Sequence, residues 1–226
     1  MFNKKVLIFG GMGSIGSSIA QKLIELGNDV SIFDSFAEET GANEFNIKEI
    51  ENKIELIKAD IRDYDKVSAA VKGIDIIFQC AGQVGHTTSM ENPVYDIDVN
   101  CKGRINVLEA CKNFNKNAKI IFLGTRTQIG SIESGMMNEN SQQNPTDIYG
   151  ADNMAAEIYH MIYNKIYGLK TSSVRLTNVY GPRSQIKSHK YGVINWMIGK
   201  AIRGEELSIF GTGEQLRDLN YIDDVV

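Results

Sequence analysis

A glycine-rich turn near the start of the chain has the spacing of a phosphate-binding loop. The segment Gly10-Gly-Met-Gly13-Ser14-Ile15-Gly16 directly follows the apolar run Val6–Phe9 and opens a helical pattern. Glycine permits a tight turn and lets the backbone approach a pyrophosphate, while a helix N-terminus offers free N–H groups and a partial positive charge. The turn therefore predicts an anion site formed by Gly10, Gly13, Ser14, Ile15 and Gly16.

An acidic residue, Asp34, ends the next apolar run along the chain. A carboxylate at the end of the second strand, roughly 20 residues after such a loop, accepts hydrogen bonds from the adenosine ribose hydroxyls of a dinucleotide. The same carboxylate would repel a 2′-phosphate, and no arginine adjoins Asp34 to offset that repulsion. Together the loop and Asp34 predict a dinucleotide site that takes NAD in preference to NADP.

Two further strand ends fit the same ligand. Asp60, at the end of the third apolar run, is placed to reach the adenine, and Ile61 to pack against its face. The small residues Ala81 and Gly82, with Gln83, end the fourth run and leave room for the pyrophosphate and the nicotinamide ribose.

These residues must be positioned by an alternation of short apolar runs and longer amphipathic segments. Short runs rich in Ile and Val suit strands of a parallel sheet covered on both faces, and strand–helix repetition gives a doubly wound α/β sheet of the Rossmann type. Gly27 and Gly168 follow the last turns of two expected helices, where helix-stop residues belong. We expect strands at Val6–Phe9, Val30–Asp34, Ile54–Ala59, Asp75–Cys80, Ile120–Gly124 and Thr171–Leu176, and helices at Ser14–Leu26, Tyr64–Val71, Tyr95–Asn113 and Ile148–Tyr167.

The alternation loosens after residue 178, which predicts a first domain over residues 1–178 and a second, smaller lobe over 179–226. The second lobe should hold a helix at Val193–Arg203 and a short strand at Ser208–Phe210. Asp223 is a plausible N-cap before an apolar pair. Because the chain stops on this helix signal, we expect the second lobe to be cut short.

Composition excludes several classes of protein. The 226 residues carry 24 Lys and Arg against 28 Asp and Glu, a net charge of −4 without basic clusters, which argues against a nucleic-acid partner. No apolar stretch approaches the roughly 18 residues needed to span a bilayer, so no membrane partner is expected. The three cysteines and three histidines lack metal-ligand or redox spacing, which predicts no metal site and a reduced, cytoplasmic compartment.

Nearly the whole chain resembles the extended short-chain dehydrogenase/reductase family, in its nucleotide-sugar epimerase and dehydratase branch. The segment from Ala81 to Pro93 looks most like epimerases of the CDP-tyvelose 2-epimerase type, and the chain also resembles UDP-glucose 4-epimerases. The motifs that carry the resemblance are Gly10–Gly16, Asp34, Ala59-Asp60, Ala81-Gly82, Val-Asn100-Cys-Lys-Gly, Thr125, Tyr149-Gly-Ala, Arg175–Pro182 and Arg217–Asp224.

The resemblance implies a transient oxidation of a sugar by NAD. By position Tyr149 would be the base and Thr125 the hydroxyl partner that binds the reacting oxygen. The substrate would be a nucleotide-diphosphate sugar bound by Thr125, Asn178 and Arg217, the last of which lies in the partial substrate lobe, 179–226. Asn100, Tyr149 and Asn153 would join the cofactor contacts. The family commonly forms dimers through two helices, here Tyr95–Asn113 and Ile148–Tyr167.

The chain departs from the family pattern Tyr-x-x-x-Lys, because Asn153 follows Tyr149 where the lysine belongs. That lysine binds the nicotinamide ribose and lowers the pKa of the tyrosine; an asparagine can do only the first. A nearby cation typically lowers the pKa of an acid by about 1–3 units, so its loss removes base strength. Two alternatives follow: a catalytically weakened binding homologue, or an epimerase whose acid–base work has moved to His86 or Asp152.

The residues after Thr125 bear on the reaction. Sugar 4,6-dehydratases similar to this chain place an Asp-Glu pair there, whereas this chain has Arg126-Thr127, without an acid to expel a hydroxyl. Dehydration is therefore disfavoured and epimerisation is the leading interpretation. Arg126 leaves a decarboxylating reaction open, since it could meet a substrate carboxylate.

Overall fold

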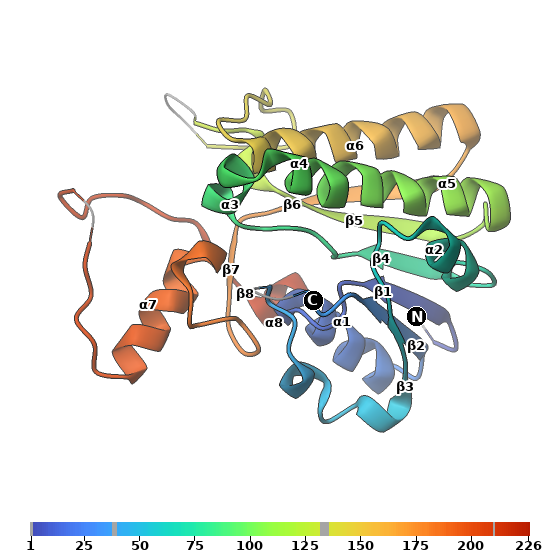
Figure 1. Ribbon diagram of the computed structural model, residues 1–226, viewed down its shortest axis with the longest axis horizontal. Helices are drawn as coiled ribbons and strands as arrows, with labels where there is room; N and C mark the ends of the chain where they lie inside the picture. Colours follow the sequence, from blue (N-terminus) through green and yellow to red (C-terminus); the bar gives the residue numbers. More distant parts are fainter. Residues whose placement is uncertain (1, 38–39, 132–135, 210) are drawn as a thin grey trace.

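Six parallel strands form the central sheet of the protein in the computed structural model, which describes residues 2–37, 40–131, 136–209 and 211–226 (Figure 1). The spatial order of the strands is β3-β2-β1-β4-β5-β6, so the order reverses between β1 and β4. This confirms the predicted doubly wound Rossmann-type α/β fold. The strands are β1 (Lys5–Phe9), β2 (Asp29–Asp34), β3 (Ile54–Lys58), β4 (Ile76–Gln79), β5 (Lys119–Thr125) and β6 (Lys170–Leu176).

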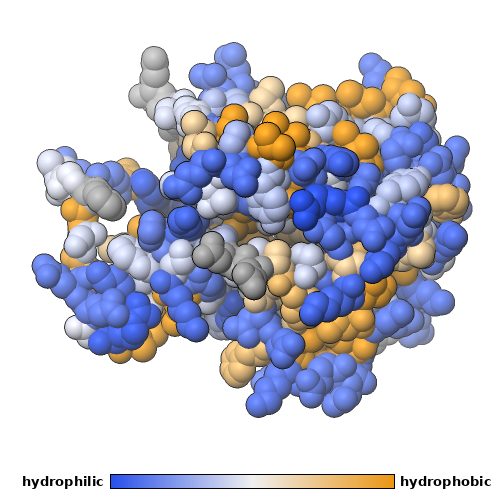
Figure 2. All heavy atoms as spheres, viewed as in Figure 1, coloured by the Kyte–Doolittle hydropathy of each residue, from blue (hydrophilic) through white to orange (hydrophobic). Residues whose placement is uncertain are grey.

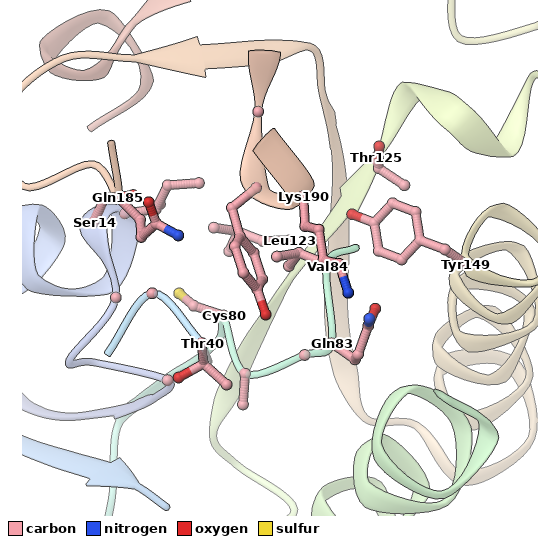
Figure 3. Close-up of a pocket in the computed structure, with 18 of the residues that line it drawn as sticks. Ser14, Thr40, Cys80, Gln83, Val84, Leu123, Thr125, Tyr149, Gln185 and Lys190 are labelled. Carbon is pink, nitrogen blue, oxygen red and sulfur yellow. The ribbon is translucent and has the colours of Figure 1, made fainter. Parts of the chain in front are cut away.

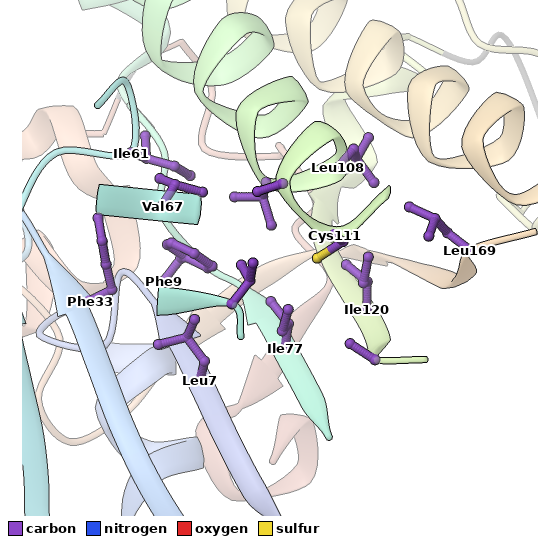
Figure 4. Packing of buried hydrophobic residues seen from close by; sticks show 14 of the residues in the cluster. Leu7, Phe9, Phe33, Ile61, Val67, Ile77, Leu108, Cys111, Ile120 and Leu169 are labelled. Carbon is purple, nitrogen blue, oxygen red and sulfur yellow. The ribbon is translucent and has the colours of Figure 1, made fainter. Parts of the chain in front are cut away.

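The two faces of the sheet are covered by different helices because side chains alternate along each strand. Val6 and Ile8 of β1 pack with the buried face of helix α1 (Ser14–Glu25). Leu7 and Phe9 point to the opposite face. That second cluster also takes residues from α2 (Tyr64–Ala70), α5 (Arg104–Phe114) and the chain just after α6 (Ile148–Tyr167), as Figure 4 shows.

The edge strands are less covered than the apolar runs predict. Leu56 in β3 is 42% exposed and Val174 in β6 is 44% exposed. Both strands lie at the ends of the sheet, where helices overlap them only in part. The expectation of a sheet covered on both faces therefore holds for the inner strands alone.

The helix expected at Tyr95–Asn113 is divided into three pieces. It begins as α4 (Pro93–Ile97), becomes the π-helical segment η3 (Asp98–Gly103) and ends as α5. Before it lies α3 (His86–Glu91), which the sequence analysis did not predict. A π-helical turn widens the helix locally and is frequent at functional sites.

A second, two-stranded parallel sheet joins β7 (Asn178–Tyr180) to β8 (Leu219–Tyr221). The predicted helix is present as α7 (Val193–Ile202). The predicted strand at Ser208–Phe210 is wrong, since Ser208 and Ile209 form no strand and Phe210 lies outside the described residues. The side chain of Ile209 is exposed, whereas β8 gains backbone partners in β7.

The last helix, α8 (Ile222–Val225), begins one residue before Asp223. Tyr221 occupies the N-cap, so Asp223 lies in the first turn and the predicted N-cap role is wrong. The remaining short segments are the 3-10 turns η1 (Glu44–Ile47), η2 (Glu51–Lys53), η4 (Arg126–Gln128) and η5 (His189–Tyr191). Among the described residues, no helix has both the length and the apolar character that crossing a bilayer requires.

Candidate active site

The glycine turn between β1 and α1 is required partly by the fold itself. Gly10 has φ +77°, and a Cβ there would lie 2.5 Å from the backbone nitrogen of Ala81. A Cβ on Gly16 would lie 2.3 Å from the carbonyl oxygen of Gly10. These two glycines therefore let the turn close and the helix pack against β1 and β4.

Gly13 is different, because nothing in the protein excludes a side chain there. A Cβ on Gly13 would meet only the carbonyl oxygen of Gly10, at an ordinary contact distance of 3.6 Å. Gly13 is also the N-cap of α1, without a side-chain cap and without an acidic residue in the first turn. Gly13, Ser14, Ile15 and Gly16 line a cavity, and a helix N-terminus of this kind suits an anion.

Asp34 is held rigidly at the end of β2 by two backbone donors. The amide of Met12 donates to its Oδ2 and the amide of Phe36 donates to its Oδ1, each at 3.0 Å. Burial raises the pKa of Asp34, and these backbone hydrogen bonds lower it. The carboxylate keeps acceptor capacity toward the cavity, as ribose recognition requires.

A cavity of about 870 Å³ runs along the carboxyl ends of the strands and is shared with the second lobe. Such crevices are where open α/β sheets bind ligands. Of the residues predicted from the sequence, the cavity is lined by Gly10, Gly13, Ser14, Ile15, Gly16, Asp34, Asp60, Ile61, Ala81, Gly82, Gln83, Thr125, Tyr149, Asn178 and Arg217.

Two predicted cofactor contacts, Asn100 and Asn153, do not line this cavity. Asn100 is fully buried behind it. Its Oδ1 accepts from the amide of Gln83 at 3.1 Å, and its Nδ2 donates to the carbonyl of Gln83 at 2.9 Å. Asn100 thus shapes the loop after β4, and any effect on a ligand is transmitted through Gln83.

Tyr149 and Thr125 lie together at one end of the cavity (Figure 3). Thr125 ends β5, and its Oγ1 accepts from the amide of Thr127 at 3.3 Å, which caps the turn η4. Tyr149 lies in the first turn of α6. Burial raises the pKa of Tyr149, while the charge of Arg104 and a hydrogen bond with Thr125 lower it.

Asn153 lies one turn after Tyr149 and is buried, with both ends of its amide engaged. Its Nδ2 donates to the carbonyl of Tyr149 at 2.7 Å. Its Oδ1 accepts from Nη1 of Arg104 at 2.8 Å. Arg104 belongs to α5, lines the cavity and was not singled out from the sequence.

His86 and Asp147 form a pair on the other side of Tyr149. His86 Nδ1 lies 2.5 Å from Asp147 Oδ2, and the imidazole meets the Tyr149 ring edge-on at 5.1 Å between centroids. Asp147 also caps α6 through its Oδ1, which accepts from the amide of Gly150. His86 lines the cavity, whereas Asp152 is buried away from it.

The domain boundary and the second lobe contribute polar groups to the far side of the cavity. Asn178 begins β7, and its Nδ2 donates to the carbonyl of Asp218 at 3.0 Å. Arg217 is exposed and lines the same side. Lys190, in η5, also lines the cavity and lies 3.6 Å from Glu91, a contact between lobes that the sequence did not indicate.

The carboxylate of Asp60 is already paired. Nε of Arg62 donates to Oδ1 at 2.9 Å and Nη2 to Oδ2 at 2.7 Å, and this pairing lowers the pKa of Asp60. In the described part of the chain, no three His, Cys, Asp or Glu side chains are grouped so as to hold a metal ion.

Comparison with known proteins places the chain among sugar-modifying enzymes. A model of the family described as "NAD dependent epimerase/dehydratase family" matches residues 6–226. A putative UDP-glucose 4-epimerase of Methanocaldococcus jannaschii is 38% identical over 224 residues, covering 97% of this chain and 70% of that protein. The CDP-paratose 2-epimerase of Salmonella typhi is 30% identical, covering 98% of this chain and 72% of that protein.

A solved structure of an epimerase has the same fold as this chain. The UDP-N-acetylglucosamine 4-epimerase of Methanobrevibacter ruminantium, in complex with UDP-N-acetylmuramic acid, superposes with a TM-score of 0.92 at 30% identity. The match covers all of this chain and 71% of that chain.

Proposed function

The chain belongs to the NAD-dependent epimerase/dehydratase family, and from this premise we propose that it epimerises a nucleotide-diphosphate sugar through transient oxidation to a keto-sugar. Its cofactor is NAD. One observation carries the proposal: the hydroxyls of Tyr149 and Thr125 meet at one end of the cavity whose other end is the glycine turn.

The residues that would hold NAD fit its chemistry. The free N–H groups after Gly13 suit the pyrophosphate, and the carboxylate of Asp34 suits the adenosine ribose. Gly82 and Gln83 line the middle of the cavity, and Asn100 fixes the backbone of Gln83. Asp60, clamped by Arg62, and Ile61 form the wall on the adenine side.

Bound NAD supplies a hydride acceptor, and the chain supplies the acid–base chemistry. Tyr149 as the phenolate would remove the proton from a sugar hydroxyl, and Thr125 would hydrogen-bond the same oxygen. When hydride returns to the other face of the keto-sugar, Tyr149 would give the proton back. Asn153 takes part through the positions of Tyr149 and Arg104.

The diphosphate of the substrate would be held by Asn178 at the end of the first domain and by Arg217 of the second lobe. Asn178 and Arg217 line the cavity opposite the glycine turn, and a guanidinium forms strong charge-assisted hydrogen bonds with phosphate. On this basis we assign residues 1–178 to the NAD-binding domain and 179–226 to the substrate lobe. The six strands of the main sheet end at Leu176, which supports that boundary.

A dehydratase is the less favoured reaction. Arg126 and Thr127 follow Thr125 in the turn η4, and neither can act as the acid that expels a hydroxyl. Arg126 lines the cavity, so a decarboxylation of a substrate carboxylate is the alternative that this residue supports.

We further propose a homodimer that forms through α6 and the α4–α5 segment. Apolar residues gather along the α6 side of the molecule in Figure 2, and α6 leaves Met161 and Ile166 more than 60% exposed. The three cysteines are free thiols, which supports a cytoplasmic location.

The proposal is tested by incubating the NAD-loaded protein with a panel of UDP-, CDP- and dTDP-sugars and following stereochemical inversion by NMR. Inversion of one sugar carbon, abolished in Tyr149→Phe, is the expected result. Binding of NAD and nucleotide-sugar without inversion or any other turnover would identify a binding homologue. Release of carbon dioxide or loss of water instead would identify the decarboxylase or the dehydratase.

A further inference from the structure

A buried arginine, Arg104, is the feature of the site that the proposed reaction has not used. Its side chain is 3% exposed, although arginine is almost never buried without a partner. Among the described residues, no carboxylate lies within ion-pair distance of its guanidinium; Nη1 instead donates to the neutral amide oxygen of Asn153. A charge kept in such a place calls for a functional reason.

The surroundings of Arg104 are built to hold its guanidinium at the cavity. The guanidinium carbon lies over the ring of Phe122, 4.7 Å from the centroid. A Cβ on Gly82 would lie 2.7 Å from Nη2, so only glycine at that position leaves room for the guanidinium. The Oδ1 of Asn153 accepts a hydrogen bond from Nη1, the other terminal nitrogen of the guanidinium. Its Nδ2 donates to the backbone carbonyl of Tyr149.

We propose that Arg104 supplies, from a neighbouring helix, the positive charge that stabilises the phenolate of Tyr149, and that Asn153 is the residue that positions it. This inference rests on the proposed function, in which Tyr149 is the base. Arg104 is a positioning residue in this scheme, because it acts on the substrate only through Tyr149.

Other charged groups also face Tyr149 and decide how much of this charge is effective. Asp96 and Asp147 oppose Arg104 by raising the pKa of Tyr149. Burial and the neighbouring Asp152 raise the pKa of Asp96 itself to about 7, so Asp96 carries only part of its negative charge at neutral pH. The carboxylate of Asp147 is in contact with His86 Nδ1. Of these groups, Arg104 is the one whose charge lowers the pKa of Tyr149.

The position of Arg104 also explains the residue at 153. A lysine there would bring an ammonium against a guanidinium that now donates across 2.8 Å to an amide oxygen. Two buried cations in contact repel each other strongly. One cation fits this site, and in this chain it comes from α5 rather than from α6.

The test measures the ionisation of Tyr149 directly. A ring-fluorinated tyrosine is placed at position 149 and titrated by fluorine NMR in the protein without substrate, in Arg104→Gln and in the control Lys102→Gln. Lys102 lies two residues away with its side chain 64% exposed. We expect Arg104→Gln to raise the midpoint by about 1–3 units and Lys102→Gln to leave it unchanged.

Turnover provides a second readout. The rise of kcat/KM with pH, which follows formation of the Tyr149 phenolate, should move to higher pH in Arg104→Gln, with a roughly 10- to 1000-fold loss at neutral pH. Arg104→Lys keeps the charge and should retain a titration midpoint near that of the parent. It provides the test if Arg104→Gln does not fold. An unchanged midpoint in folded Arg104→Gln, or an Arg104→Lys midpoint as high as that of Arg104→Gln, would overturn the proposal. Because the titration needs no sugar, it stands even if the substrate class is wrong.

Discussion

Replacing Asn153 by lysine restores the family motif, yet the structure predicts that Asn153→Lys damages the protein. The substitution exchanges an amide oxygen that accepts from Arg104 at 2.8 Å for an ammonium. The new side chain is buried, since Asn153 is only 1% exposed. Two cations then share a site that holds one.

The size of the effect follows from Coulomb's law. Two unit charges about 4 Å apart repel by roughly 4 kcal/mol at an effective dielectric constant of about 20. Losing a hydrogen bond to a charged group adds about 1.5–3 kcal/mol. Loss of the lysine proton would cost about 4–5 kcal/mol at pH 7, which is no less than the repulsion, so the lysine keeps its charge at that pH. We therefore expect the free energy of unfolding to fall by roughly 6 kcal/mol at pH 7.

Urea unfolding of the parent and the variant at several pH values measures this loss. Repulsion of about 4 kcal/mol lowers the pKa of the buried lysine by roughly 3 units, from about 10.4 to about 7.5. Between these values the unfolded chain binds more protons than the folded chain, so stability rises with pH in that window. Asn153→Lys should therefore recover most of its stability as the pH rises from about 7.5 to 10.4.

Two controls separate charge from bulk. Asn113→Lys makes the same change at an exposed position of α5 and should shift stability by less than about 0.5 kcal/mol. The double variant Arg104→Gln, Asn153→Lys holds a single cation and should be more stable than Asn153→Lys by a few kcal/mol, with turnover restored toward the parent. If Asn153→Lys is as stable as the parent at pH 7 and turns over faster, the one-cation reasoning is wrong.

Three further predictions concern separate parts of the protein. Gly13→Ala should weaken NAD binding at least about 10-fold in calorimetry without lowering the unfolding midpoint. Gly16→Ala should lower the unfolding midpoint, because its Cβ would lie 2.3 Å from the Gly10 carbonyl oxygen; equal losses of stability in the two variants would contradict the separate roles of Gly13 and Gly16. Asp34→Asn should lower NAD affinity about 10-fold and reduce the preference for NAD over NADP, since the charge that repels a 2′-phosphate is gone. An unchanged ratio of NAD affinity to NADP affinity would show that Asp34 does not face the ribose. Burial lowers the pKa of His160 to about 4, so below about pH 6.5 the unfolded chain binds a proton that the folded chain does not. The free energy of unfolding should therefore fall by up to about 1.4 kcal/mol per pH unit as the pH drops toward 4. His160→Phe should reduce this slope, and a slope equal to that of the parent would show that His160 is not its source.

The parts of the site that follow from local sequence could be predicted. The ends of strands can be recognised in the sequence, because an apolar run ends at the glycine turn, at Asp34 or at Thr125. All three line one cavity. Tyr149 was identified through its resemblance to the family motif, whereas the helix that it opens was predictable from its period and is present at Ile148–Tyr167.

The place of Arg104 in the site could not be predicted from the sequence, because its burial depends on contacts between segments that are far apart in the chain. In the sequence it is an arginine in an amphipathic helix, and the common fate of such a residue is exposure. Its burial depends on Phe122 and Asn153, which come from β5 and α6. The only local signal is its spacing of four residues from Asn100, which the π-helical segment η3 makes unreliable as a guide to helix faces.

The second lobe was harder to predict for a related reason. The strands β7 and β8 are three residues each, too short for a periodic pattern, and they pair across about forty intervening residues. Lys190 reaches the cavity from a short turn between them, and no apolar period marks its direction.

The strand order of the main sheet has a consequence for how the chain is made. β1 receives its second neighbour only when Val6 pairs with Ile76, so about seventy residues must leave the ribosome before this central strand has both partners. Contacts between residues so far apart in the sequence form slowly. Until then Val6, Leu7, Ile8 and Phe9, all fully buried in the finished protein, form an uncovered apolar segment of the nascent chain. A chaperone that binds short hydrophobic stretches could therefore bind this segment, directly before the phosphate-binding turn, until residue 76 has been made.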